Sequence, residues 1–156
     1  MDRIAMQIRL VKIEELSYKN VTRQDRDIRE SVLVKLLLNV LPDVSSNTIE
    51  LNVGVIYHTH SRDLLNYEIK STFEIGEIDA ILRVRDYSVS IAPELLSILV
   101  GVSIGSLRGM LVLRTKGSIF ENYPLPIINV TELIASLQTE TITQRSYFPF
   151  FRFKYE

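Results

Sequence analysis

The sequence predicts an α+β domain in which an antiparallel sheet is followed by helices, and two observations lead to this prediction. The first half of the chain alternates apolar and polar residues with a period of two, which is typical of strands that bury one face. The second half holds an apolar run of helical length between residues that favour a helix start and a helix stop. Because the strands come first, we expect the helices to cover one face of a four-stranded sheet.

The clearest strands form a hairpin. Apolar residues alternate with polar ones over residues 49–57 and again over 65–75, and the segment HTHSRD connects the two runs. A further strand is predicted from Val32 to Val40, where turn-forming residues 42–47 follow. The first strand, from about Ala5 to Lys19, has an alternation that changes phase, as a β-bulge would cause.

A long helix is predicted for the second half of the chain. Pro93 and Glu94 suit the first turn of a helix, the apolar run from Leu95 to Leu113 follows, and Gly117 offers a stop. The result is a helix of roughly 20 residues.

Two shorter features flank this helix. The segment before it, which contains Arg83, Arg85 and Asp86, is interpreted as a loop with a short extra strand or turn. After it, Asn129 and Glu132 resemble a capping box for a short helix from Val130 to about Gln138. We therefore expect a single domain over residues 1–140 and a separate tail over 141–156.

Composition excludes several classes of function. A net charge of −1 without a Lys/Arg cluster argues against a nucleic-acid partner. The absence of cysteine removes disulfides, thiolate metal sites and cysteine nucleophiles. The N-terminus has no apolar run typical of a signal peptide, and the longest uncharged stretch, Leu95 to Leu107, is shorter than the about 20 residues of a membrane span. We expect a cytoplasmic protein without membrane insertion.

Two patterns suggest an enzyme, but in both the surrounding sequence lacks other features that an active site needs. Residues 101–105 match G-x-S-x-G, but a hydrolase needs Ser103 on a strand-to-helix turn and a histidine after it. Here the motif lies within a helical pattern, and both histidines precede it. His58 and His60, two apart on a predicted strand, could bind a metal with Asp63, yet zinc needs three or four ligands. A solvated strand end explains them better, so no metal, cofactor or catalytic residue is expected.

Small residues recur along the predicted long helix. Ser97, Gly101, Gly105 and Gly109 are four apart, so they share one face. Each glycine costs about 0.5–1 kcal/mol relative to alanine, and close approach of another backbone would compensate. That backbone belongs either to the domain's own sheet or to a helix of another subunit, and the second alternative is the basis for a predicted oligomer interface.

The chain ends in YFPFFRFKYE, where Phe151, Phe153 and Tyr155 alternate with Arg152 and Lys154. This alternation predicts a strand with one aromatic face. The tail either packs on the domain or a neighbouring subunit as a structural segment, or it fills part of a binding groove and leaves when a client binds.

Four stretches, in their order and spacing, resemble the SecB family of export chaperones over about residues 4–137. The first is the opening strand QIRLVKIEELSYKN, with the acidic–aliphatic–Ser–aromatic pattern of residues 15–18. The second is the hairpin from Thr48 to Ile78, which ends in STFEIGEI, and the third is Lys116-Gly117 after the long helix. The fourth is PLPIINVTELI, in which the pattern is held by Pro126, Asn129, Glu132 and Leu133.

The resemblance implies an ATP-independent holdase that binds unfolded or partly folded polypeptides and assembles as a dimer of dimers, with dimers formed through sheet edges and tetramers through the long helices. It also implies a translocase motor subunit as a further partner. The binding groove would be lined by the loop before the last helix, by that helix and by neighbouring strands. The candidate groove residues, each of which could instead be ordinary core, are Phe120, Tyr123, Leu125, Ile127 and Leu133.

Two departures from the family's pattern bear on the function. The segment from Val21 to Ser31 is densely charged where the family has groove residues, and the tail is aromatic where the family's is polar. They favour a divergent relative, and the choice between general export and a dedicated client such as an antitoxin stays open. The alternative is a non-chaperone assembly protein that reuses the fold.

Overall fold

The computed structural model describes residues 7–22, 28, 30–76, 82–85, 88–137 and 146–155, and for 82–85, 88–90, 136–137 and 146–155 it describes the backbone alone. Some predictions therefore lie outside the described residues: the start of the first strand at Ala5, the ends of the hairpin at Ile78 and of the short helix at Gln138, and most of the charged segment after the first strand.

The core of the fold is an antiparallel sheet. Its four long strands are β1 (Ile8–Asn20), β2 (Val32–Asp43), β3 (Thr48–His58) and β4 (Asp63–Ile75), arranged in the order β1-β4-β3-β2. The C-terminal segment forms β7 (Ser146–Tyr155), which pairs antiparallel with β2 and makes it a five-stranded sheet. The hairpin predicted from the period-two alternation is β3 and β4, and its prediction is confirmed.

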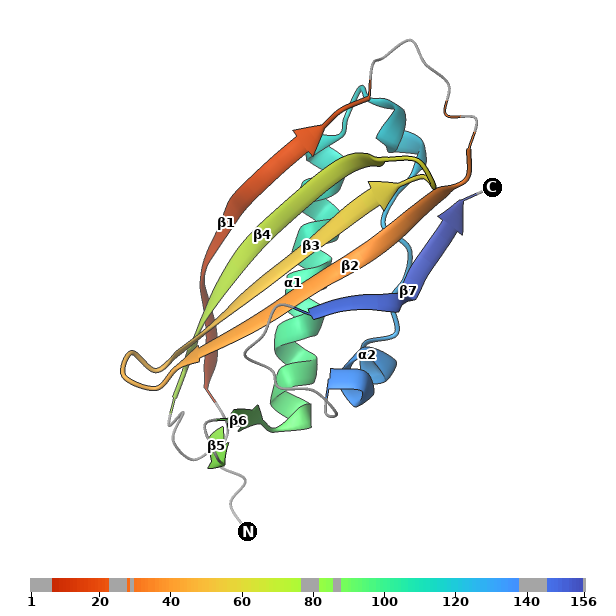
Figure 1. Ribbon diagram of the computed structural model, residues 1–156. Coiled ribbons are helices and arrows are strands. Elements are labelled where there is room, and N and C mark those ends of the chain that lie inside the picture. Colours follow the sequence, from red (N-terminus) through yellow and green to blue (C-terminus); the bar gives the residue numbers. More distant parts are fainter. Residues whose placement is uncertain are drawn as a thin grey trace.

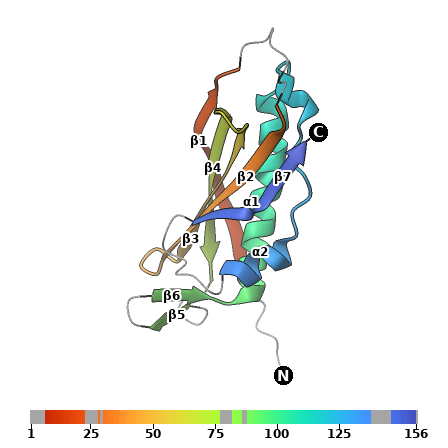
Figure 2. The same ribbon diagram turned by 45° about the vertical axis from the view of Figure 1, so that its right-hand side comes forward.

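The helices lie on one face of this sheet (Figures 1 and 2). The long helix α1 (Pro93–Arg114) packs on β3 and β4, and the short helix α2 (Val130–Leu137) packs beside α1. A short 3-10 helix, η2 (Ile119–Asn122), follows α1. The α+β prediction, a four-stranded antiparallel sheet followed by one long and one short helix, is confirmed.

A second, small sheet precedes α1. Strands β5 (Leu82–Arg85) and β6 (Ser88–Ile91) form an antiparallel hairpin, which lies at the end of the molecule where α1 begins (Figure 2). The short extra strand expected before the long helix is therefore a two-stranded ribbon.

The sheet residues that face α1 are buried and almost all apolar, as the alternation requires; Ser71 is a polar exception. On β3 they include Ile49, Leu51, Val53, Val55 and Tyr57. The phase change in β1 comes from two register shifts, at Val11 and Leu16, each of which is an extra residue relative to β4. Val11 and Leu16 are both exposed at these bulges, so each is an extra apolar residue that interrupts the alternation.

The limits of α1 follow from its terminal residues. Pro93 occupies the first turn, where a missing N–H costs nothing, and Glu94 complements the helix dipole there. The helix ends at Arg114. Thr115, the C-cap, still donates through its N–H and Oγ1 to the carbonyl of Leu111, and the chain then turns at Gly117, whose φ is +82°. By length and composition α1 could span a membrane, yet in the structure some of its apolar residues, such as Leu95, Leu99 and Leu107, are buried in the core.

The second helix begins as its capping pattern predicts. The backbone N–H of Glu132 donates to Asn129 Oδ1 at 3.1 Å, which satisfies one of the free donors of the first turn. The other face of the sheet carries polar residues and ion pairs along β1 and β4, such as Arg9 with Glu74 at 2.9 Å.

Candidate functional site

A cavity of about 400 Å³ lies where α1 ends, between the sheet and the connection to α2. Tyr57 and Leu65 form the wall on the sheet side, and the last turn of α1 forms a second wall. The segment from Phe120 to Leu125 closes the third side. The lining is mostly apolar, so the cavity suits aliphatic or aromatic groups.

An aromatic cluster holds this end of the molecule together. The ring of Phe120 packs edge-on against Tyr57, with 5.5 Å between centroids, and lies 6.2 Å from the ring of Tyr123. The hydroxyl of Tyr57 donates to the carbonyl oxygen of Tyr123 at 2.8 Å, which satisfies a buried polar group and fixes the connecting segment to the sheet.

The turn after α1 is built from local hydrogen bonds. Gly117 has a φ of +82°, a conformation that glycine adopts without strain. Ser118 Oγ donates to the carbonyl of Thr115 at 2.7 Å and accepts from the N–H of Phe120 at 3.2 Å. The serine therefore caps η2 and directs Phe120 into the cavity wall.

Arg108 fixes the connecting segment from the other side. Its guanidinium donates to the carbonyl of Leu125 at 3.3 Å and to that of Pro126 at 2.9 Å. With the bond from Tyr57, these contacts tie the connection to both the helix and the sheet, so the cavity has firm walls.

The rim of the cavity is exposed. Leu113, on the outer side of the last turn of α1, is 75% exposed although its side chain is apolar, and Val112 beside it is also exposed. Lys116 and Glu121 add one charge of each sign at the edge. An apolar cavity with an apolar rim can accept side chains of another polypeptide without any directional requirement.

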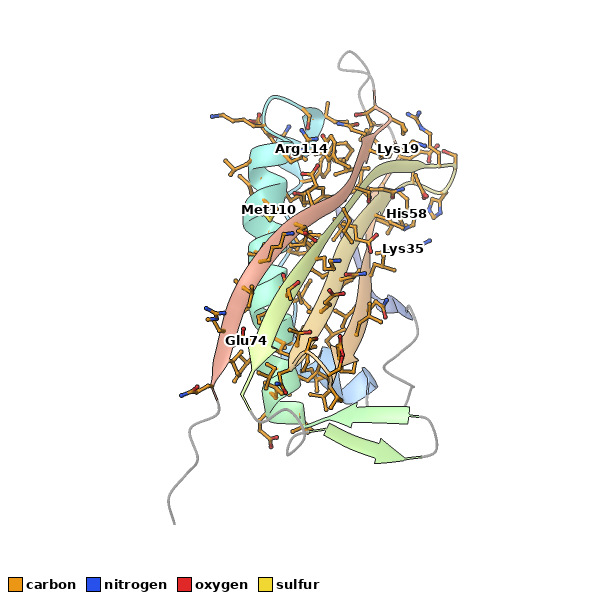
Figure 3. All side chains as sticks on the ribbon, turned by 90° about the vertical axis from the view of Figure 1, so that its left-hand side faces the viewer. Lys19, Lys35, His58, Glu74, Met110 and Arg114 are labelled. Atoms are coloured by element: carbon orange, nitrogen blue, oxygen red, sulfur yellow. The ribbon has the colours of Figure 1, made fainter. Side chains whose placement is uncertain are left out.

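A polar cluster anchors the edge strand β1 beside the cavity. Arg114 ion-pairs with Glu15 at 3.2 Å, and its guanidinium lies over the ring of Tyr18 at 4.3 Å from the centroid (Figure 3). The hydroxyl of Tyr67 donates to Glu15 Oε2 at 3.1 Å. Burial, together with this carboxylate, raises the pKa of Tyr67 to about 12, so the hydroxyl keeps its proton and remains a donor.

The structure separates the five candidate groove residues into three environments. Phe120, Tyr123 and Leu125 line the cavity together. Leu133 is 0% exposed and belongs to the core between α2 and α1, so in this conformation it touches no bound chain. Ile127 is 91% exposed and lies outside the cavity lining.

Several lining residues were missed by sequence reasoning. Tyr57 and Leu65 belong to strands assigned to the core, and Val112 and Leu113 belong to the apolar run of the long helix. A signal in the sequence was that three apolar residues follow one another at the end of the run: a helix can turn only part of such a triplet to the core, and here Leu111 is buried whereas Val112 and Leu113 are exposed.

The glycine face of α1 points away from the sheet. A Cβ placed on Gly101, Gly105 or Gly109 would meet nothing within 4 Å, and Ser97 is half-buried. Packing against the domain's own sheet, one of the two explanations of these glycines, is therefore wrong. The neighbouring residues Ile98 and Val102 are exposed and apolar, so none of the described segments covers this face of α1.

The enzyme-like patterns have no active geometry among the described residues. Ser103 is 0% exposed, because it faces the sheet from the middle of α1. The expected pairing of His58 and His60 on one strand is wrong: β3 ends at His58, which is buried rather than solvated, and its Nδ1 lies 3.1 Å from the carbonyl oxygen of Thr59. Within the described ranges, no three His, Asp or Glu residues gather as a metal site.

The buried hydroxyl of Ser103 gives a test of its structural role. Its Oγ has no hydrogen-bond partner among the described residues, and an unsatisfied buried hydroxyl costs about 1–3 kcal/mol. We expect Ser103→Ala to leave the free energy of unfolding unchanged or to raise it by about 1 kcal/mol, as measured by urea denaturation. Ser106→Ala, which removes a bond from an exposed hydroxyl to Val102, is the control. A loss of more than about 1 kcal/mol for Ser103→Ala would contradict this interpretation.

A scan of the sequence against protein-family models finds no match, and a search of curated proteins finds none either.

Proposed function

We propose that the protein is an ATP-independent, SecB-like holdase that binds unfolded or partly folded polypeptides at the end of α1. The observation that carries the proposal is the apolar cavity with its exposed apolar rim, in which Leu113 is 75% exposed. A soluble domain that leaves such a surface open has a use for it, because contiguous exposed apolar patches mark interaction sites.

The cavity suits clients of many sequences. Its walls are aromatic and aliphatic, and burial of a Leu or Phe side chain contributes about 1.5–3 kcal/mol without regard to direction. An extended chain that inserts one or two such side chains binds reversibly, as a holdase requires. The sequence carries no phosphate-binding loop, so nucleotide has no part in the cycle.

The uncovered face of α1 has a separate role in this proposal. Gly101, Gly105 and Gly109 leave room for a second helix, and Ile98 and Val102 beside them offer apolar area to bury. Helix-to-helix contact across this face joins two dimers, each formed through a sheet edge, into a homo-oligomer that is a dimer of dimers.

The arrangement of elements supports the SecB-like assignment. The sheet of β1 to β4, the long helix and the short helix occur in the order that the family resemblance implies. Within the proposal, the protein is cytoplasmic, and it serves either export, with a translocase motor as the receiver, or one dedicated client such as an antitoxin.

A pair of surface variants tests the proposal. We expect the purified protein to suppress aggregation of an unrelated, chemically unfolded protein without nucleotide. Leu113→Asp places a charge on the cavity rim and should weaken binding of an unfolded client at least tenfold, because the charge must lose water there. Val44→Asp, at an apolar site that is 45% exposed in the β2–β3 turn at the other end of the sheet, is the control (Figure 1).

Both substitutions are on the surface, so their stabilities should stay within about 0.5 kcal/mol of the parent. The holdase proposal fails if aggregation is not suppressed, and binding restricted to one native partner would favour the assembly-protein alternative. Equal effects of the two substitutions on client binding would exclude the cavity as the site.

A further inference from the structure

The aromatic tail is a strand of the sheet, and it covers the edge of β2. Strand β7 pairs with β2 over two short segments: Tyr155 to Phe153 lie opposite Val32 to Val34, and Phe148 to Ser146 lie opposite Leu36 to Leu38. On its other side β2 pairs with β3 without interruption from Leu33 to Asp43. On this edge of β2, β7 therefore pairs with fewer residues than β3 does on the opposite edge.

A break in the register separates the two segments. Between Val34 and Leu36 the partner on β7 jumps from Phe153 to Phe148, so residues 149–152 stand against the single residue Lys35. Pro149 lies in this break, and proline has no backbone N–H to give to a neighbouring strand. Pro149 therefore removes one donor from the ladder between β2 and β7 at the place where the ladder is broken.

The edge of β2 is otherwise well formed for strand addition. Val32, Val34 and Leu36 are fully buried against the helix side of the sheet, so the backbone between them is held in place by the core. A fixed edge of this kind presents a row of backbone donors and acceptors to any extended chain, and such an edge is a template for pairing.

We infer that the edge of β2 is a second polypeptide-binding site, at which an extended client segment without proline adds to the sheet in place of β7. The inference rests on the proposed function, and it names the form in which part of the client is held. A continuous strand pairs with β2 through the position of the break, so it makes backbone bonds that β7 cannot make.

The alternative occupant is the tail of a second copy of this chain. That tail carries the same Pro149 and leaves the same break, so the exchange gains no bond. It also loses the short connection between Leu137 and Ser146, which keeps the chain's own β7 at a high effective concentration. The observations therefore favour a client segment.

The sequence of the tail indicates which clients fit. Its last residues alternate aromatic and basic side chains, FRFKY, and Phe153 and Tyr155 pair with positions of β2 that face the core. We expect the preferred client segment to carry apolar or aromatic residues at every second position over about six residues.

A reversible lock tests the exchange in the full-length protein. The chain has no cysteine, so one engineered pair forms without competition. Leu33 and Lys154 are directly opposite in the ladder, and paired Cα atoms at about 4.5–5.5 Å fit a disulfide. The double variant Leu33→Cys with Lys154→Cys ties β7 to β2 when oxidised and releases it when reduced.

The control is the same operation at the opposite edge of the sheet. Lys19 on β1 and Asn66 on β4 are also directly paired, so Lys19→Cys with Asn66→Cys adds a disulfide and removes one lysine without touching β2. The probe is a dye-labelled peptide, RSYFVFFRFKYE, which is the tail from Arg145 to Glu156 with valine at the position of Pro149.

We expect oxidation of the β2–β7 pair to weaken probe binding at least tenfold, and reductant to restore it, while the control pair binds equally in both states. Aggregation of an unfolded protein is followed in parallel with the same samples. Suppression that falls on locking and returns on reduction supports the inference.

The contradicting outcomes are distinct. The inference is overturned if the probe binds equally to the oxidised and the reduced β2–β7 variant, or if the two cysteines never form a disulfide within one chain. A disulfide between two chains identifies the second copy as the occupant. If the oxidised variant still suppresses aggregation, the holdase proposal is kept and only the proposed site at β2 is rejected. If the protein never suppresses aggregation but the lock still blocks the probe, the holdase proposal fails and the strand exchange stands for a narrower partner.

Discussion

Replacement of Phe120 by alanine will lower the free energy of unfolding by about 3–5 kcal/mol. The side chain is 2% exposed and packs against the rings of Tyr57 and Tyr123, so its removal leaves a void beside the existing cavity. The walls cannot close over this void, because hydrogen bonds from Tyr57 and Arg108 hold the connecting segment in place. Urea denaturation at a fixed protein concentration measures the loss.

Ile127→Ala is the matched control for this substitution. Both residues belong to the connection between α1 and α2, and both were candidates for the groove, yet Ile127 is 91% exposed. Its replacement should change the free energy of unfolding by no more than about 0.5 kcal/mol. If the two variants are equally stable, Phe120 does not hold the cavity wall, and the account of the site fails.

Replacement of Gly105 by leucine will separate the subunits and leave each one folded. A Cβ at this position has no neighbour within 4 Å among the described residues, so a side chain can be added there, and loss of a helical glycine favours the isolated subunit by about 0.5–1 kcal/mol. Across the proposed interface, the same side chain keeps the two helices apart and removes dispersion contacts along the seam. We expect at least a tenfold weaker association in sedimentation equilibrium.

Gly105→Ala separates the two effects. Alanine removes the cost of a helical glycine to the same degree, but adds only a methyl group, so it should stabilise the subunit and weaken assembly much less than leucine does. A parent protein that sediments as a monomer, or a leucine variant that assembles like the parent, would refute the helix-to-helix interface. A leucine variant that unfolds would show instead that α1 is covered within its own chain.

Most of the secondary structure was predictable because its causes are local. The alternation over residues 49–57 and 65–75 depends on neighbours two apart, and it yields β3 and β4 directly. Pro93 at the start of α1 and Asn129 at the start of α2 act within one helical turn, so their roles can be recognised without the rest of the fold. The bulges in β1 were visible as a change of phase for the same reason.

The candidate site was only partly predictable. Phe120, Tyr123 and Leu125 lie around one cavity as a stretch of sequence, but Tyr57 and Leu65 reach it from strands far away in the chain. Ile127 and Leu133 look equivalent as aliphatic residues near the last helix. One is exposed and the other fully buried, because α1 lies against only the second.

By itself, the sequence determined the order and type of the elements, the absence of cysteine chemistry and the glycine spacing on the long helix. Only the tertiary structure decided that these glycines face outward, that the cavity forms at the end of α1, and that the aromatic tail pairs with β2 across a broken ladder. The physical reason is the sequence separation over which each interaction acts. Periodicity and capping act between residues a few positions apart, whereas exposure, cavities and strand partners depend on which distant segments meet.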